Sequence, residues 1–162
     1  MRTTNRGFFE PWEPVQSARH FTLAGQREEI ERALQDARRD ARYAFGVFLR
    51  QTDELIGRVA LSNVSRGAWQ NATLGYYIDE AHTRRGYATE AVTLTLQFAF
   101  VTAGLHRVQA AVLPRNVASR RVLEKAGFVR EGRSTKYLQI NGVWEDHEVF
   151  AVTAEDFQEL EP

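Results

Sequence analysis

The sequence of 162 residues contains no cysteine. This absence excludes disulfide bonds, thiolate zinc sites and a cysteine nucleophile, and it agrees with a reducing compartment. No apolar run approaches the roughly 18 residues of a membrane span. Residues 1–14 lack the apolar core of a signal peptide and contain acidic side chains. We therefore expect a cytoplasmic protein that has no membrane partner.

A net charge is also lacking, because 21 lysine and arginine residues balance 21 aspartate and glutamate residues. Without net basic charge or a recognisable motif, no nucleic-acid partner is expected. The composition is otherwise typical of a globular protein, with 43% hydrophobic residues. The length predicts a single domain over residues 1–162, long enough to bury a hydrophobic core.

Residues 26–42 predict the first helix of the chain. Apolar residues recur there at helical spacing, while charged residues occupy most other positions. This pattern is typical of a surface helix with one apolar side. The apolar residues are Ile30, Ala33, Leu34, Ala37 and Ala41.

The rest of the chain predicts a sheet with crossover helices. Three strands come first, and a helix that is apolar over most of its circumference follows, as expected for a buried crossover helix. A strand–helix–strand crossover joined to antiparallel strands indicates an α/β (α+β) fold with a mixed, mostly antiparallel sheet. The predicted elements are strands 43–50, 54–64 and 72–79, helix 86–102, strand 106–114, helix 116–126, and strands near 137–140 and 147–153.

The segment HTRRGYATEAV (82–92) places two arginines and a glycine between a predicted strand and a buried helix. The first N–H groups of a helix have no intrahelical partner and carry partial positive charge, and glycine lets a phosphate approach the backbone. The segment is neither a Walker A loop nor a GxGxxG dinucleotide motif. Local physics alone slightly favours a polar turn that binds no ligand.

The segment NVASRRVLEKAGF (116–128) predicts a helix that Asn116 caps and Gly127 ends. Asn116 and Ser119 follow the carboxyl end of a predicted strand, where ligands bind in open α/β sheets. Two helix starts that suit an anion, separated by one crossover, favour a common ligand site more than either start alone.

Together these two segments resemble the acetyl-CoA-binding core of the GNAT superfamily of N-acyltransferases. Four further segments are similar to its ribosomal-protein-alanine N-acetyltransferase branch: PWEP (11–14), SNVSRG (62–67), LGYYI (74–78) and YLQINGVWEDH (137–147). The resemblance covers nearly the whole chain. It implies direct transfer of an acetyl group from acetyl-CoA to an amine in a ternary complex, by a monomer or homodimer.

The family pattern also differs from this sequence at two places. Its members usually carry glutamine or arginine where this chain has Thr83, which matters little if the loop binds through backbone N–H groups. They usually start with a β-strand before the PWEP segment. The resemblance therefore implies a GNAT fold without the usual first strand, or a sequence whose start is truncated.

The resemblance assigns roles to individual residues. Ser119 matches a family serine and is expected to protonate the departing thiolate, although a serine there can also bond its own backbone. Trp12, Glu13 and Asp146 are expected to bind substrate, and no metal ligand is expected. The expected cofactor-binding residues are Ile78 as an oxyanion donor, Arg84, Arg85, Gly86, Tyr87, Ala88, Thr89, Asn116, and Arg121 at the 3′-phosphate.

No general base stands out in the sequence. Leu138 occupies the position of a glutamate in a neighbouring branch, and Glu13, Asp146 and His147 each have a structural interpretation. An α-amine with a pKa of about 8 is already partly neutral near pH 7, so no single essential base is expected. The acceptor is expected to be a protein N-terminus such as that of a ribosomal protein. A small-molecule amine and a non-catalytic acyl-CoA-binding role stay open.

Overall fold

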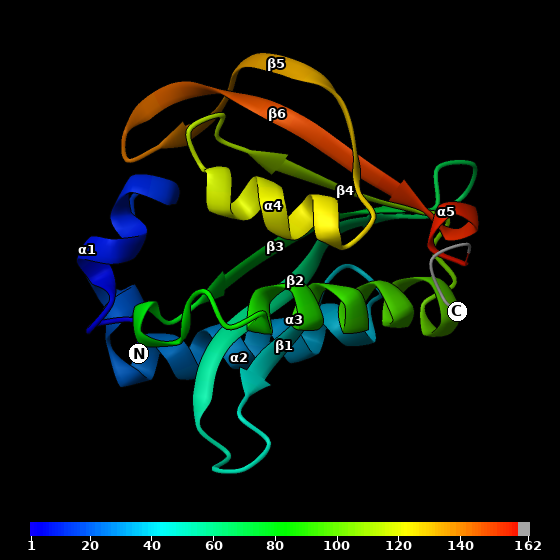
Figure 1. Cartoon of the computed structure of the whole chain (residues 1–162). Helices are drawn as coiled ribbons and strands as arrows, with labels where there is room; N and C mark the ends of the chain where they lie inside the picture. Colours follow the sequence, from blue (N-terminus) through cyan, green and yellow to red (C-terminus); the bar gives the residue numbers. More distant parts are fainter. Residues whose placement is uncertain (159–162) are drawn as a thin grey trace.

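The computed structural model describes residues 1–158. Their six strands form one sheet in the order β1–β2–β3–β4–β6–β5 (Figure 1). Only β3 and β4 are parallel, and the other neighbours are antiparallel, which confirms the mixed, mostly antiparallel sheet. The strands are β1 (Tyr43–Phe48), β2 (Leu55–Ser65), β3 (Asn71–Ile78), β4 (Arg107–Val112), β5 (Val129–Ile140) and β6 (Val143–Thr153).

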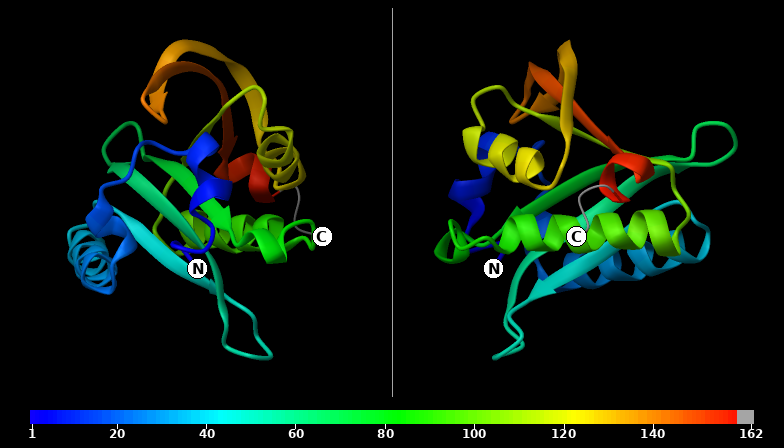
Figure 2. Two further views of the ribbon diagram at one scale, coloured as in Figure 1. Left: turned by 90° about the vertical axis from the view of Figure 1, so that its left-hand side faces the viewer. Right: turned by 45° about the vertical axis from the view of Figure 1, so that its right-hand side comes forward.

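Helices cover both faces of the sheet, with α2 on one side and α3 and α4 on the other (Figure 2). The helices are α1 (Arg6–Phe9), α2 (Leu23–Arg38), α3 (Tyr87–Gln97), α4 (Val117–Lys125) and α5 (Ala154–Gln158). Three short 3₁₀ turns are η1 (Glu10–Trp12), η2 (Ala18–Phe21) and η3 (Glu80–His82), and a π-helical turn, η4 (Phe98–Thr102), follows α3. No helix within residues 1–158 is long and apolar enough to cross a membrane.

The main core lies between the sheet and the layer of α3 and α4. Leu61 of β2, Leu74 of β3 and Val108 of β4 are buried in one cluster with Leu96 of α3 and Leu123 of α4. Because α4 contributes to the same core as α3, the starts of both crossover helices are fixed relative to the sheet. This arrangement positions the candidate site.

The prediction that Ile30 and Leu34 belong to a buried apolar side of the first helix is wrong. Ile30 and Leu34 are 59% and 57% exposed, and the helix begins at Leu23 and ends at Arg38. Polar contacts hold the helix to the sheet instead, because Glu29 lies 3.0 Å from both Arg42 and Arg58. Helical spacing of apolar residues alone did not distinguish the buried side from the exposed side.

The C-terminal hairpin is longer than predicted. The predicted strands 137–140 and 147–153 are the ends of β5 and β6, which begin at Val129 and Val143. Most of β5 is exposed and its register with β6 is irregular after Arg130 and after Ser134, so it lacks a regular apolar alternation. The predicted helix 86–102 is divided into α3 and the π-helical turn η4.

Candidate active site

The candidate site begins where β3 and β4 part. Their pairing extends only from Asn71 opposite Arg107 to Thr73 opposite Gln109, although β3 continues to Ile78. The Asp79 N–H donates to the Ile56 carbonyl oxygen at 2.7 Å. Because N–H groups alternate in direction along a strand, the Ile78 N–H points away from β2, towards the side of β4. This direction fits the predicted oxyanion donor, whose role stays a prediction.

The segment 82–92, in which residues 84–89 are predicted to bind the phosphates of the cofactor, leads directly into α3. Gly86 is its N-cap with φ 86°, and Arg84 also has a left-handed backbone with φ 62°. The backbone N–H groups of residues 84–89 meet no hydrogen-bond acceptor within residues 1–158. These donors stand at the positive end of the helix dipole, so Arg84, Arg85, Gly86, Tyr87, Ala88 and Thr89 fit the binding of a pyrophosphate.

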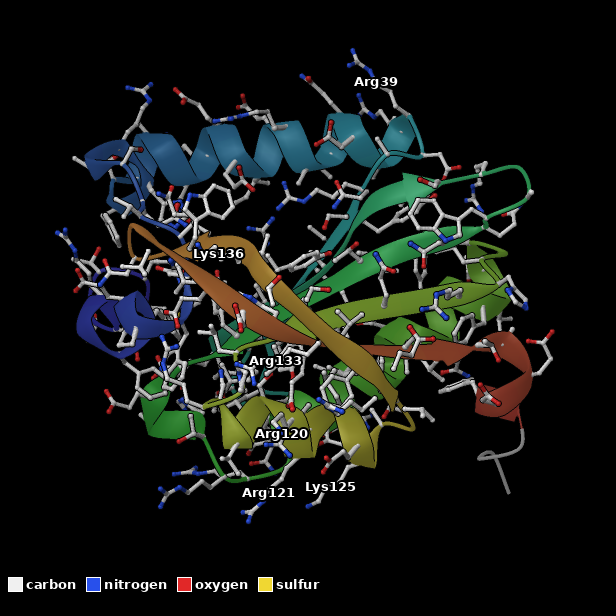
Figure 3. The ribbon with its side chains drawn as sticks, turned by 90° about the horizontal axis from the view of Figure 1, so that it is seen from above. Arg39, Arg120, Arg121, Lys125, Arg133 and Lys136 are labelled. Carbon is white, nitrogen blue, oxygen red and sulfur yellow. The ribbon has the colours of Figure 1, made fainter. Side chains whose placement is uncertain are left out.

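A hollow of about 470 Å³ runs beside the start of α3. Gly86 and Thr89 line it together with Lys125 of α4, a residue that the sequence analysis did not assign. Figure 3 shows Arg121 and Lys125 pointing away from the sheet on the outer side of α4, whereas Arg120 pairs with Glu148. The spacing of one helical turn between Arg121 and Lys125 was the available signal for this basic pair. Both cations suit the phosphates of a CoA molecule.

The start of α4 has the predicted cap. The side-chain oxygen of Asn116 accepts a hydrogen bond from the Ser119 backbone N–H at 3.0 Å, which confirms Asn116 as the N-cap. The Ser119 hydroxyl lies 2.8 Å from the hydroxyl of Tyr76 on β3. Burial raises the pKa of Tyr76 to about 12, so the phenol stays protonated near neutral pH. Tyr76 therefore joins the candidate site, although its sequence position gave no such signal.

Glu13 is engaged by another side chain. Its two carboxylate oxygens lie 2.6 and 2.7 Å from Nη2 of Arg2, and its carbonyl oxygen accepts from the Asn141 N–H of the hairpin tip at 3.0 Å. These contacts favour a scaffold role over that of a general base. The neighbouring Trp12 is 38% exposed, and the guanidinium of Arg115 lies over its ring at 5.6 Å. Trp12 is therefore available to line an acceptor cleft.

Asp146 is also engaged, within the hairpin. Its carboxylate accepts from the Lys136 N–H at 2.9 Å and pairs with Arg133 at 3.0 Å. The Lys136 N–H, followed by Arg133, holds the pKa of Asp146 below its usual value. His147 is buried, with Nδ1 3.0 Å from the Glu145 carbonyl oxygen. Within the described residues, no group of three or more histidine or acidic side chains is placed to hold a metal ion.

Comparison with known proteins identifies the class of this site. Residues 2–129 match the model of the acetyltransferase (GNAT) domain family. The chain is 45% identical over 156 residues to the probable N-acetyltransferase YjcK of Bacillus subtilis, covering 96% of this chain and 86% of that protein. It is 33% identical over 153 residues to the ribosomal protein uS5-alanine N-acetyltransferase of Escherichia coli, covering 94% of this chain and 79% of that protein.

Two solved structures have the same fold. The ribosomal-protein-S5-alanine acetyltransferase of Vibrio fischeri superposes with a TM-score of 0.91 at 34% identity, covering 96% of this chain and 85% of the other. The RimJ protein of Mycobacterium smegmatis, solved with CoA-disulfide, also gives 0.91 at 32% identity, covering 99% and 76% of the two chains.

The chain belongs to the GNAT acetyltransferase family. It is an acetyl-CoA-dependent N-acetyltransferase, similar to the ribosomal-protein-alanine branch as its motifs indicated. The N–H groups at the start of α3 and the basic side of α4 would hold the cofactor, which supplies an activated acetyl thioester. The non-catalytic alternative is thereby set aside.

Proposed function

We propose that the protein acetylates the N-terminal α-amine of a protein substrate, with ribosomal protein as the acceptor class. Among its relatives, those of E. coli and V. fischeri are named for alanine of a ribosomal protein. In this chain Ser119 would protonate the departing thiolate and the N–H of Ile78 would stabilise the oxyanion. Trp12 would contact the acceptor, while Glu13 and Asp146 would shape its site through their ion pairs.

The observation that carries this proposal is the apolar wall around Arg115. Arg115 lies over Trp12 and forms an ion pair with Glu145 of β6, which neutralises that carboxylate. Leu138 is opposite Glu145 in the hairpin register and is 41% exposed. An exposed tryptophan and an exposed leucine beside an ion-paired Glu145 support a small neutral first residue, such as alanine, over a polyamine.

An acetyl-transfer assay with two kinds of acceptor tests this function. We expect acetyl-CoA to release CoA thiol about tenfold faster with a peptide starting in alanine or serine than with spermidine at equal concentration, because the apolar wall disfavours a second cation. The same peptide with a blocked N-terminus is the control and gives only background release. Faster turnover of spermidine than of every peptide would instead identify a small-amine acetyltransferase.

We propose further that the family sheet is present here without its usual first strand. Within residues 1–158, β1 pairs only with β2 and forms one edge of the sheet. A hollow of about 500 Å³ lies beside it, lined among others by Phe45 of β1 and by Leu94 and Phe98. On this proposal the outward N–H groups of β1 exchange with deuterium at least about tenfold faster than those of β3. Equal protection in the two strands would show that another segment covers the edge.

Residues 1–162 are proposed to form one acetyltransferase domain that acts as a monomer or homodimer. Its cytoplasmic location and the expected lack of nucleic-acid and membrane partners stay predictions from the sequence.

A further inference from the structure

Tyr76 and Ser119 connect β3 to the first turn of α4. The phenol oxygen of Tyr76 lies 2.8 Å from the Ser119 hydroxyl and 3.1 Å from the Ser119 carbonyl oxygen. Tyr76 is packed against the main core, and its strand has already parted from β4 after Thr73. The contact therefore lies where the candidate oxyanion donor and the start of α4 meet.

The phenol has one proton and two possible acceptors, so the pair has two arrangements. When Tyr76 donates to the carbonyl oxygen, the 2.8 Å contact requires the Ser119 hydroxyl to donate to the phenol. When Tyr76 donates to the Ser119 hydroxyl, the serine proton is available for another acceptor. Among residues 1–158, the phenol of Tyr76 is the only side-chain group that hydrogen-bonds the Ser119 hydroxyl. The phenol thus controls where the serine proton points.

We propose that Tyr76 is a positioning residue that donates to the Ser119 hydroxyl and thereby directs the serine proton to the sulfur of the cofactor. The inference rests on the proposed role of Ser119 as proton donor. As the amine nitrogen bonds to the acetyl carbon and the carbon–sulfur bond breaks, Ser119 gives its proton to sulfur. The proton that the nitrogen loses returns to Ser119 through solvent. The bond from Tyr76 strengthens while the serine oxygen carries negative charge, so it acts mainly in the transition state.

Removing the phenol hydroxyl tests whether Tyr76 acts through Ser119. We expect Tyr76→Phe to lower kcat about tenfold with KM for acetyl-CoA unchanged within about twofold, since one hydrogen bond is lost in the transition state. In the Ser119→Ala background the same change lowers kcat by less than about twofold, because the two residues act as a unit. Tyr77→Phe, at the next position of β3, is the matched control and keeps the full rate.

The binding of CoA to the same proteins tests, without any turnover, whether the Ser119 hydroxyl is directed at the cofactor sulfur. A hydroxyl directed at sulfur favours the thiolate, so the affinity for CoA relative to desulfo-CoA is expected to rise about fivefold between about pH 7 and about pH 9. Comparison with desulfo-CoA cancels titrations of the protein itself, and the Tyr76 phenol stays protonated over this range. Tyr76→Phe is expected to abolish the rise, and Tyr77→Phe to preserve it.

The outcomes separate this inference from the proposed function. Full activity of Tyr76→Phe, or losses that multiply in the double variant, would overturn the positioning role while the wild type still acetylates peptides. A pH rise in CoA affinity that persists in Tyr76→Phe would overturn it as well. A wild type that acetylates spermidine but no peptide would refute the acceptor class, and the double-variant comparison would then be measured with spermidine.

Discussion

Gly86→Val is expected to weaken CoA binding about 100-fold, far more than loss of either neighbouring arginine side chain. Gly86 has φ 86°, a conformation that costs a residue with a Cβ about 1–2 kcal/mol. Among residues 1–158, apart from the two chain neighbours of Gly86, no atom lies within 4 Å of an added Cβ, so the substitution meets no clash there. The further loss arises because a branched side chain keeps phosphate away from the N–H groups of residues 84–89. Calorimetric titration with CoA measures it.

Matched variants separate strain from lost binding. Gly67 in the β2–β3 turn also has a positive φ, 69°, and open space around its Cβ. We expect Gly67→Val to cost similar stability and leave CoA affinity unchanged. Arg84→Ala and Arg85→Ala are expected to weaken CoA only about two- to fivefold, because both side chains are exposed and the backbone makes the site. Larger losses at the arginines than at Gly86 would show that 82–92 is only a basic turn.

Local signals in the sequence were sufficient to predict where α3 and α4 begin. The cap at Asn116 depends on a contact only three residues away, and the start of α3 is marked by a glycine with a positive φ. The strand–helix–strand order then implied which starts share one end of the sheet. These features follow from spacing along the chain, and the structure agrees with them.

Contacts between distant segments could not be predicted in the same way. Tyr76 and Ser119 are 43 residues apart, and nothing in either segment indicates their pairing. Glu13 has a carboxylate and was therefore a candidate base in the sequence. Its ion pair with Arg2 favours a scaffold role instead. Ile30 and Leu34 have the spacing of a buried side, yet ion pairs determine how α2 faces the sheet. Each outcome depends on which surfaces meet in three dimensions.

Arg2→Ala is expected to lower the free energy of unfolding by about 3 kcal/mol, because it leaves the Glu13 carboxylate partly buried without its partner. The Arg2 and Glu13 side chains are only 6% and 21% exposed. The guanidinium also packs against two neighbouring rings, 4.8 Å from that of Phe9 and 4.7 Å from that of Tyr77, and its Nε donates to His20. These contacts attach the N-terminal segment, which carries Trp12, to β3. Urea denaturation measures the loss.

A second arginine and a double variant give this prediction its controls. Arg6 stacks at 4.8 Å on Phe21 but is exposed, so Arg6→Ala is expected to cost less than about 1 kcal/mol. Adding Glu13→Ala to Arg2→Ala is expected to cost little more, since the unpaired carboxylate is removed together with its penalty. A loss below about 1 kcal/mol for Arg2→Ala, or two fully additive losses, would mean that this ion pair does not anchor the segment. In that event the position of Trp12 would have to depend on Arg115 and the hairpin alone.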